Sequence, residues 1–128
     1  MKNVIDSSAW LSYFAEDGNC ENFTLPIEDI DNLIVPSITI TEIFKHILRE
    51  RNEESALTIT AHMSQGKVIS LDQDLAIEAA SFGVNHKLPL TDSIIYATTL
   101  KFDATLWTQD ADFKGLSNVN YFSKSSST

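Results

Sequence analysis

Short apolar runs alternate with stretches of helical periodicity along almost the whole chain, and this alternation constrains the fold more than any other feature. The runs predicted to form strands are residues 2–6, 33–35, 68–71 and 105–107, with 119–122 as a last edge strand. Strands that alternate with helices form a mostly parallel sheet covered by helices on both faces. Right-handed crossovers then bring the carboxyl ends of these strands to one edge. The predicted fold class is therefore α/β.

Helical patterns fill the segments between the predicted strands. They begin after residue 7 or 8, near Pro26, at residue 37 or 39, at residues 52–54, at Asp72, and at residue 91 or 92. Ser7 or Ser8 is expected to cap the first helix. Pro26 is expected in the first turn of a short second helix, where its missing N–H costs nothing. The helix that starts at Asp72 is expected to end near Gly83.

The size and composition of the chain favour one globular domain. A chain of 128 residues, 43% of them hydrophobic, can bury a core and is too apolar to be disordered. We expect a domain over residues 1–122 and a polar tail over 123–128. The single cysteine, Cys20, excludes an internal disulfide framework and a cysteine-based zinc site. The first strand leaves no room for a signal peptide, and no apolar run approaches a membrane span, so a cytoplasmic protein is expected.

The net charge of −9 argues against a broad basic face for nucleic acid. It does not exclude an enzyme that meets phosphates through metal ions. If five of the 18 acids were metal ligands, 13 would remain against nine bases. The resulting mildly acidic surface would suit a basic protein partner.

Acidic residues follow two of the predicted strands. Asp6 ends the first strand, and Asp110 and Asp112 follow the strand at 105–107. Ligands bind at the carboxyl ends of strands in open α/β sheets. Because no Lys or Arg adjoins the last two acids, their carboxylates repel each other, and a divalent cation is the usual remedy. The alternative for these two is a polar loop that caps a short helix.

Two further acids are predicted near the same edge. Glu42 lies in the first turns of the helix after the second strand, and Asp92 lies at the start of its helix, in register with an apolar stripe. An acid aimed inward is costly unless it is paired or metal-bound. Alternatively, Asp92 is an N-cap and Glu42 a solvated residue. Carboxylates without a Cys or His cluster favour Mg²⁺ or Mn²⁺, the metals of two-metal phosphodiester hydrolysis.

Four segments in this order resemble a known family. They are Val-Ile-Asp-Ser-Ser at 4–8, Thr-Glu-Ile at 41–43, Leu-Thr-Asp-Ser-Ile-Ile-Tyr-Ala at 90–97 and Thr-Gln-Asp-Ala-Asp-Phe at 108–113. Together they resemble the PIN-domain ribonucleases, specifically the VapC-type toxins of bacterial toxin–antitoxin pairs. The resemblance implies a single PIN-like domain, an RNA substrate, a cognate antitoxin and a homodimer.

The resemblance also assigns roles to individual residues. It implies that the catalytic and metal-binding acids are Asp6, Glu42, Asp92 and Asp110, with Asp112 as a fifth metal ligand. Thr108 and Ser8 match positions with small polar side chains that orient the site.

A basic helix face adjoins the predicted site. Lys45 and Arg49 lie three and seven residues after Glu42, hence on one helix face, where they could hold RNA phosphates. The alternative is a solvated face with a Glu42–Lys45 pair.

Other classes of protein fit the sequence less well. A receiver domain would need an acidic pair after strand one and a late Lys, where Ser7, Ser8 and Thr108 stand. An aspartate phosphatase would need an acid at the position of Ser8. A non-catalytic PIN-like protein-binding module stays open as the alternative to an endoribonuclease.

Overall fold

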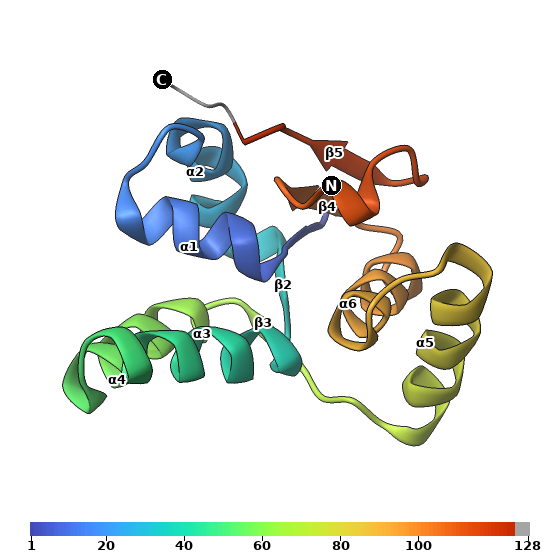
Figure 1. Cartoon of the computed structure of the whole chain (residues 1–128), viewed down its shortest axis with the longest axis horizontal. Coiled ribbons are helices and arrows are strands. Elements are labelled where there is room, and N and C mark those ends of the chain that lie inside the picture. Colours follow the sequence, from blue (N-terminus) through green and yellow to red (C-terminus); the bar gives the residue numbers. More distant parts are fainter. Residues whose placement is uncertain (125–128) are drawn as a thin grey trace.

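The computed structural model describes residues 1–124 and contains a five-stranded parallel sheet (Figure 1). The strands are β1 (Asn3–Ile5), β2 (Leu33–Pro36), β3 (Lys67–Ile69), β4 (Thr105–Thr108) and β5 (Val119–Tyr121). Their order across the sheet is β3-β2-β1-β4-β5, and every pair is parallel. The predicted α/β class and parallel sheet are confirmed. Most of the predicted polar tail, 123–128, lies outside the described residues.

Helices cover both faces of this sheet, as the sequence predicted. They are α1 (Ser7–Ala15), α2 (Cys20–Glu28), α3 (Ser37–Glu50), α4 (Glu53–Met63), α5 (Gln73–His86) and α6 (Leu90–Lys101), with the short 3₁₀ turns η1 (Ile30–Asn32) and η2 (Ala111–Phe113). In Figure 1, α1 to α4 lie on one side of the sheet, and α5 and α6 lie on the other. No helix within residues 1–124 is long and apolar enough to cross a bilayer.

The central strand β1 divides its side chains between two cores. Ile5 packs with Trp10 of α1 and Phe23 of α2, whereas Val4 packs with Tyr96 of α6 and Leu106 of β4. Successive strand residues point to opposite faces, which explains this division. Both β1 side chains are fully buried, and each such burial stabilises the fold by roughly 1.5–3 kcal/mol. Strand β1 is therefore a rigid support for the residue that follows it.

The cap of α1 differs from the sequence prediction. Asp6, not Ser7 or Ser8, is the N-cap, and its carboxylate accepts a hydrogen bond from the backbone N–H of Ala9 at 3.1 Å. The strand ends at Ile5 and the helix begins at Ser7, so Asp6 is the one extended residue between them. A strand-to-helix turn this short places the Asp6 carboxylate at the carboxyl edge of the sheet.

The prediction for Pro26 was also wrong. Helix α2 begins at Cys20, so Pro26 lies in its last turn and is buried there. Proline cannot donate the helical hydrogen bond and disfavours further turns. The helix continues only to Glu28 and then gives way to η1.

Helix α5 extends beyond its predicted end at Gly83. It ends at His86, and Lys87 adopts the left-handed conformation with φ of 56° as the C-cap. A Cβ atom at position 83 would lie 3.4 Å from the Cβ of Ser93. This is an ordinary van der Waals distance, so Gly83 lies within the helix against α6 and does not end it.

Candidate active site

Asp6 is buried at the end of the central strand and is held by several donors. It is 2% exposed. Its Oδ1 atom accepts hydrogen bonds from Ser8 Oγ at 2.8 Å and from Ala9 N at 3.1 Å. Burial raises the pKa of the carboxyl to about 6, although hydrogen bonds from Ser8, Ala9 and Thr108 oppose this rise. Asp6 is thus fixed in orientation and lies in a site that disfavours its charge.

Asp92 is buried in the first turn of α6. The cap of that helix is Pro89, so Asp92 is not the N-cap considered from the sequence. Residues 92–99 are all buried, with Asp92 9% exposed. Desolvation, followed by the nearby charges of Asp110 and Asp6, raises the pKa of Asp92 to about 8. An acid kept in so unfavourable a place points to a functional role.

Asp110 and Asp112 follow β4 and complete an acidic cluster. One carboxylate oxygen from each of Asp92, Asp110 and Asp112 lies within 4.8 Å of the other two. The backbone N–H of Asp110 donates to Thr108 Oγ1, and Asp110 Oδ1 accepts from the N–H of Asp112, both at 2.9 Å. These local bonds hold the loop that presents the two acids. Thr108 hydrogen-bonds to both Asp6 and the backbone N–H of Asp110.

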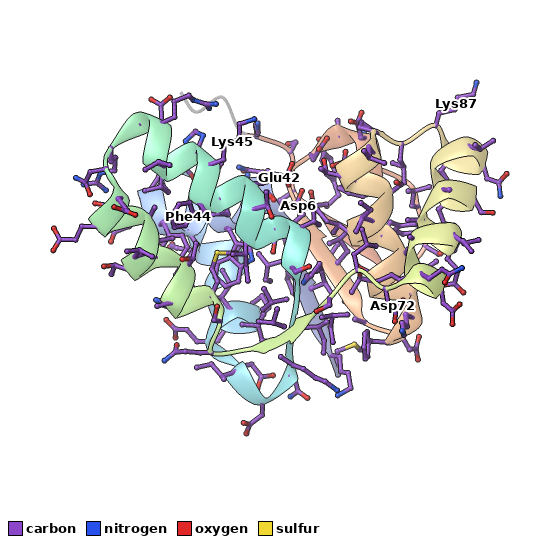
Figure 2. All side chains as sticks on the ribbon, turned by 90° about the horizontal axis from the view of Figure 1, so that it is seen from below. Asp6, Glu42, Phe44, Lys45, Asp72 and Lys87 are labelled. Atoms are coloured by element: carbon purple, nitrogen blue, oxygen red, sulfur yellow. The ribbon has the colours of Figure 1, made fainter. Side chains whose placement is uncertain are left out.

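Glu42 approaches from α3 on the other side of Asp6. Its carboxylate accepts a hydrogen bond from Ser7 Oγ, the residue next to Asp6. In Figure 2, Asp6 and Glu42 lie close together, between the helix pair α3 and α4 and the helix pair α5 and α6. Glu42 is not one of the three acids within mutual reach. Glu42, Lys45 and Arg49 line one groove of about 420 Å³ on α3, so the predicted helix face exists.

Basic side chains do not neutralise these acids. Within residues 1–124, the ion pairs are Arg49–Glu50 at 3.3 Å and Lys101–Asp72 at 3.9 Å, and neither involves the cluster. Among the neighbours that shift the pKa of Asp92, every charged one is another acid. A set of hard oxygen donors without a countercharge fits a divalent cation such as Mg²⁺ or Mn²⁺.

Comparison with known protein families assigns residues 4–118 to the PIN domain family. The chain is a PIN domain. The match spans most of the sequence and includes all the acids described above. The family resemblance seen in the sequence is confirmed at this level. No curated protein sequence matches the chain.

Solved structures share this PIN fold at low sequence identity. A toxin–antitoxin complex from Klebsiella pneumoniae has a TM-score of 0.79 and 22% identity, with 96% of this chain and 100% of that chain covered. VapC20 of Mycobacterium tuberculosis, a sarcin–ricin loop cleaving toxin, has a TM-score of 0.75 and 17% identity, with 91% and 95% covered. VapBC2 of Rickettsia felis, bound to a promoter DNA fragment, has a TM-score of 0.73 and 14% identity, with 96% and 98% covered.

An amide bridge in this PIN domain was not predicted from the sequence. Asn19 Nδ2 donates to Gln109 Oε1 at 2.8 Å, across 90 residues of sequence. Gln109 in turn donates from Nε2 to the carbonyl of Ser8 at 3.1 Å and from its backbone N to Ser8 Oγ at 3.4 Å. Ser8 is the donor to Asp6, so the bridge supports the orientation of that acid. Gln109 stood within the motif at 108–113, but no local signal indicates Asn19 as its partner.

We expect Asn19→Ala to destabilise this PIN domain by about 1–3 kcal/mol, because it leaves the Gln109 carbonyl oxygen without its donor. Both amides are only 9% exposed, so water replaces the lost bond poorly. Urea denaturation measures the loss. The matched control is Asn85→Ala, at an exposed position of α5. Equal stability of the two variants would contradict a structural role for the bridge.

Proposed function

We propose that this PIN domain is a divalent-metal-dependent endoribonuclease and the toxin of a toxin–antitoxin pair. The observation that carries the proposal is the group of acids at the carboxyl edge of the sheet, with Asp92 buried against like charges. Such a group costs folding free energy and gains nothing from an internal countercharge. Its purpose is then chemical rather than structural.

The residues proposed to hold Mg²⁺ or Mn²⁺ are Asp6, Glu42, Asp92, Asp110 and Asp112. When bound, the cation supplies the positive charge and Lewis acidity that in-line attack of water on a phosphodiester requires. Ser8 and Thr108 orient Asp6 through hydrogen bonds. The short connection from β1 to α1 and the 3₁₀ turn after β4 hold the acids in fixed relative positions.

RNA cleavage by the purified protein tests the enzymatic part of the proposal. A structured RNA and a single-stranded RNA are incubated with Mg²⁺, with Mn²⁺, and with EDTA in excess. We expect internal cuts with either metal and none with EDTA. If the RNA stays intact under all conditions, the enzymatic part of the proposal is wrong and a non-catalytic binding role is the alternative.

The proposed partners follow from the structural relatives and from the charge of the chain. The Klebsiella relative is a toxin–antitoxin complex, and the Rickettsia relative is a VapBC pair on its promoter DNA. A chain with a net charge of −9 suits a partner segment that is basic. We therefore propose a cognate antitoxin whose basic side chains reach the acidic site. Co-expression with the product of an adjacent small gene, followed by co-purification, tests this assignment.

We expect the double variant Lys45→Ala, Arg49→Ala to weaken RNA binding more than the chemical step. Both side chains line the Glu42 groove, and neither is a proposed metal ligand. Loss of two phosphate contacts would lower the slope of log affinity against log salt by about 1.4, because single-stranded RNA gives roughly 0.7 per contact. Single-turnover cleavage at saturating RNA and several salt concentrations separates the two effects.

The control for this experiment removes two charges away from the groove, as in Lys2→Ala, Lys87→Ala. Lys87 lies at the far end of α5, well apart from Lys45 (Figure 2). If the slope of log affinity against log salt is unchanged in the Lys45, Arg49 variant, these two side chains are solvated and do not bind RNA. A collapsed rate at saturating RNA would place one of them in the chemical step.

A further inference from the structure

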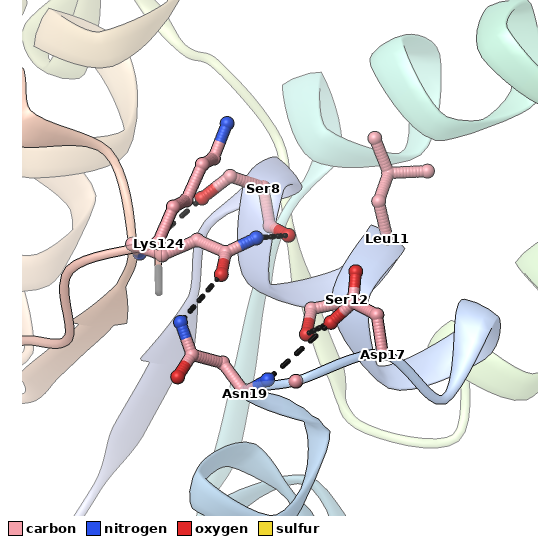
Figure 3. Close-up of a pocket in the computed structure, with 8 residues that line it drawn as sticks. Ser8, Leu11, Ser12, Asp17, Asn19 and Lys124 are labelled. Carbon is pink, nitrogen blue, oxygen red and sulfur yellow. Dashed lines mark hydrogen bonds between the residues drawn. The ribbon is translucent and has the colours of Figure 1, made fainter. Parts of the chain in front are cut away.

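A pocket of about 500 Å³ lies beside the acidic site and has no role in the proposed chemistry so far. It opens between α1, the α1–α2 loop, the residue after β4 and the segment that follows β5 (Figure 3). Among the described residues that line it, Asp17 is the one anion and Lys124 the one cation, and Leu11 supplies an apolar wall. A volume of this size is typical of small-molecule sites rather than of packing defects.

This pocket adjoins a second hollow that reaches one of the site acids. Ser8, Gln109 and Lys124 also line a second hollow of about 450 Å³, which reaches Asp110. A ligand that contacts Asp110 would therefore have the first pocket as a neighbouring space, with Lys124 at the border of both. Two neighbouring hollows of this size suit a polymer in which one unit reacts while the next is bound.

The carboxylate of Asp17 is held with one oxygen unused. Its Oδ1 atom accepts from Ser12 Oγ and from the backbone N–H of Asn19 at 3.4 Å. No donor within residues 1–124 contacts its Oδ2 atom. Figure 3 shows Asp17 and Lys124 on opposite sides of the pocket, with the Lys124 side chain extended away from Asp17.

We propose that this pocket is a nucleobase subsite for the nucleotide next to the scissile phosphate, and that it selects guanine. Guanine presents two adjacent N–H donors on its Watson–Crick edge, which match the free acceptor of Asp17. Bases of single-stranded RNA are commonly read on this edge. Lys124 is placed for the phosphate of the same nucleotide. The proposal deepens the ribonuclease function and rests on it for its biological role.

Uracil fits the same pocket less well. Its single ring N–H lies between two carbonyl oxygens, which the Asp17 carboxylate repels. Specificity here would come from acceptor–donor matching, because the described lining offers no aromatic side chain for stacking. The amide groups of Asn19 and Gln109 bind each other and Ser8. They therefore form a rigid wall of the pocket and do not recognise the base.

Metal-free titration with 5′-GMP and with 5′-UMP tests the subsite independently of cleavage. Backbone amide shifts of Gly18, Asn19 and Gln109 in NMR spectra report occupancy. We expect both nucleotides to shift these amides, with GMP binding roughly fivefold to tenfold more tightly. Equal affinity, or shifts confined to other residues, would overturn the proposal without any variant being made.

The decisive variant is Asp17→Asn. Asparagine keeps the Oδ1 acceptor for Ser12 and Asn19 but replaces Oδ2 with an N–H₂ donor. We expect the preference for GMP to disappear in Asp17→Asn and to persist in Glu16→Gln, which removes the same charge one residue away, outside this pocket. A preference retained in Asp17→Asn would overturn the assignment of Asp17.

Cleavage of a short RNA library with randomised bases separates the two proposals. Cuts next to guanine, with the bias lost in Asp17→Asn, would support both of them. Cleavage without any base bias that depends on Asp17 would overturn the subsite and leave the ribonuclease standing. GMP binding in the pocket without any RNA cleavage would overturn the ribonuclease and leave a guanine nucleotide site.

Discussion

Asp92→Asn is expected to abolish RNA cleavage and at the same time to make the metal-free protein more stable. The loss of activity should exceed about 100-fold, because even outer-shell changes at metal sites cost roughly 10–100-fold. The gain in stability follows from the burial of Asp92 among other acids, which raises its pKa to about 8. A neutral amide of the same shape removes a charge that the folded state disfavours.

The opposite signs of these two effects make the test specific. Damage to the fold would lower activity and stability together, whereas a sacrificed metal ligand lowers only activity. Single-turnover cleavage with metal measures the activity. Urea denaturation at pH 8 without metal measures the stability. The matched control is Asp74→Asn, an exposed acid in the first turn of α5. Cleavage by Asp92→Asn at near the wild-type rate would remove Asp92 from the site.

Divalent metal is expected to stabilise the wild-type protein strongly at pH 8. A ligand that binds only the folded state at 100 times its dissociation constant adds about 2.7 kcal/mol. For a domain of this size, that corresponds to a rise in Tm of roughly 10 °C. Differential scanning fluorimetry with Mn²⁺, Mg²⁺ and, as a control, equal ionic strength of Na⁺ measures the shift. The same metals should have a much smaller effect on Asp92→Asn.

The metal-free protein should lose stability as pH rises from about 4 to 8. The pKa values of Asp6 and Asp92 are raised from 3.8 to about 6 and about 8. In this window the folded state holds protons that the unfolded chain has released, so the free energy of unfolding decreases with rising pH. Each unit of pKa shift is worth about 1.4 kcal/mol. Metal binding requires the ionised acids, so its stabilising effect should grow over the same range.

A metal-free stability that rises between pH 5 and 8 would contradict the raised pKa values. A rise in Tm with Mn²⁺ that is as large at pH 5 as at pH 8 would separate metal binding from these two acids. Either result would require different ligands for the cation, and the other carboxylates of the cluster would then be tested one at a time.

The acids of the site were predictable because their positions follow from strand ends. Strand β1 and the run at 105–107 are visible as apolar segments, and parallel pairing brings Asp6 and Asp110 to one edge. Asp92 was predictable because it is an acid at the start of a helix whose following residues are apolar. The structure buries this helix, Asp92 included. These are local patterns combined with one rule of topology, and they need no knowledge of side-chain packing.

The features that sequence reasoning missed depend on contacts between distant segments. Asn19 meets Gln109 only after α1 and its loop fold back on β4. The position of Pro26 depends on where α2 starts, and its N-cap Asn19 uses its side chain for Gln109 rather than for capping. The pocket beside Asp17 is bounded by α1, its following loop and the segments after β4 and β5, so no single stretch of sequence indicates it.

The central place of β1 in the sheet has a consequence for protein synthesis. Asn3 to Ile5 pair with Thr105 to Trp107, so β1 waits for a strand that is synthesised much later. Closing so long a loop is slow compared with local helix formation. Asp6 therefore meets Asp110 only after β4 has been made, and a chain truncated before β4 lacks the assembled acidic cluster. The cluster proposed to bind metal is thus incomplete until β4 has paired with β1.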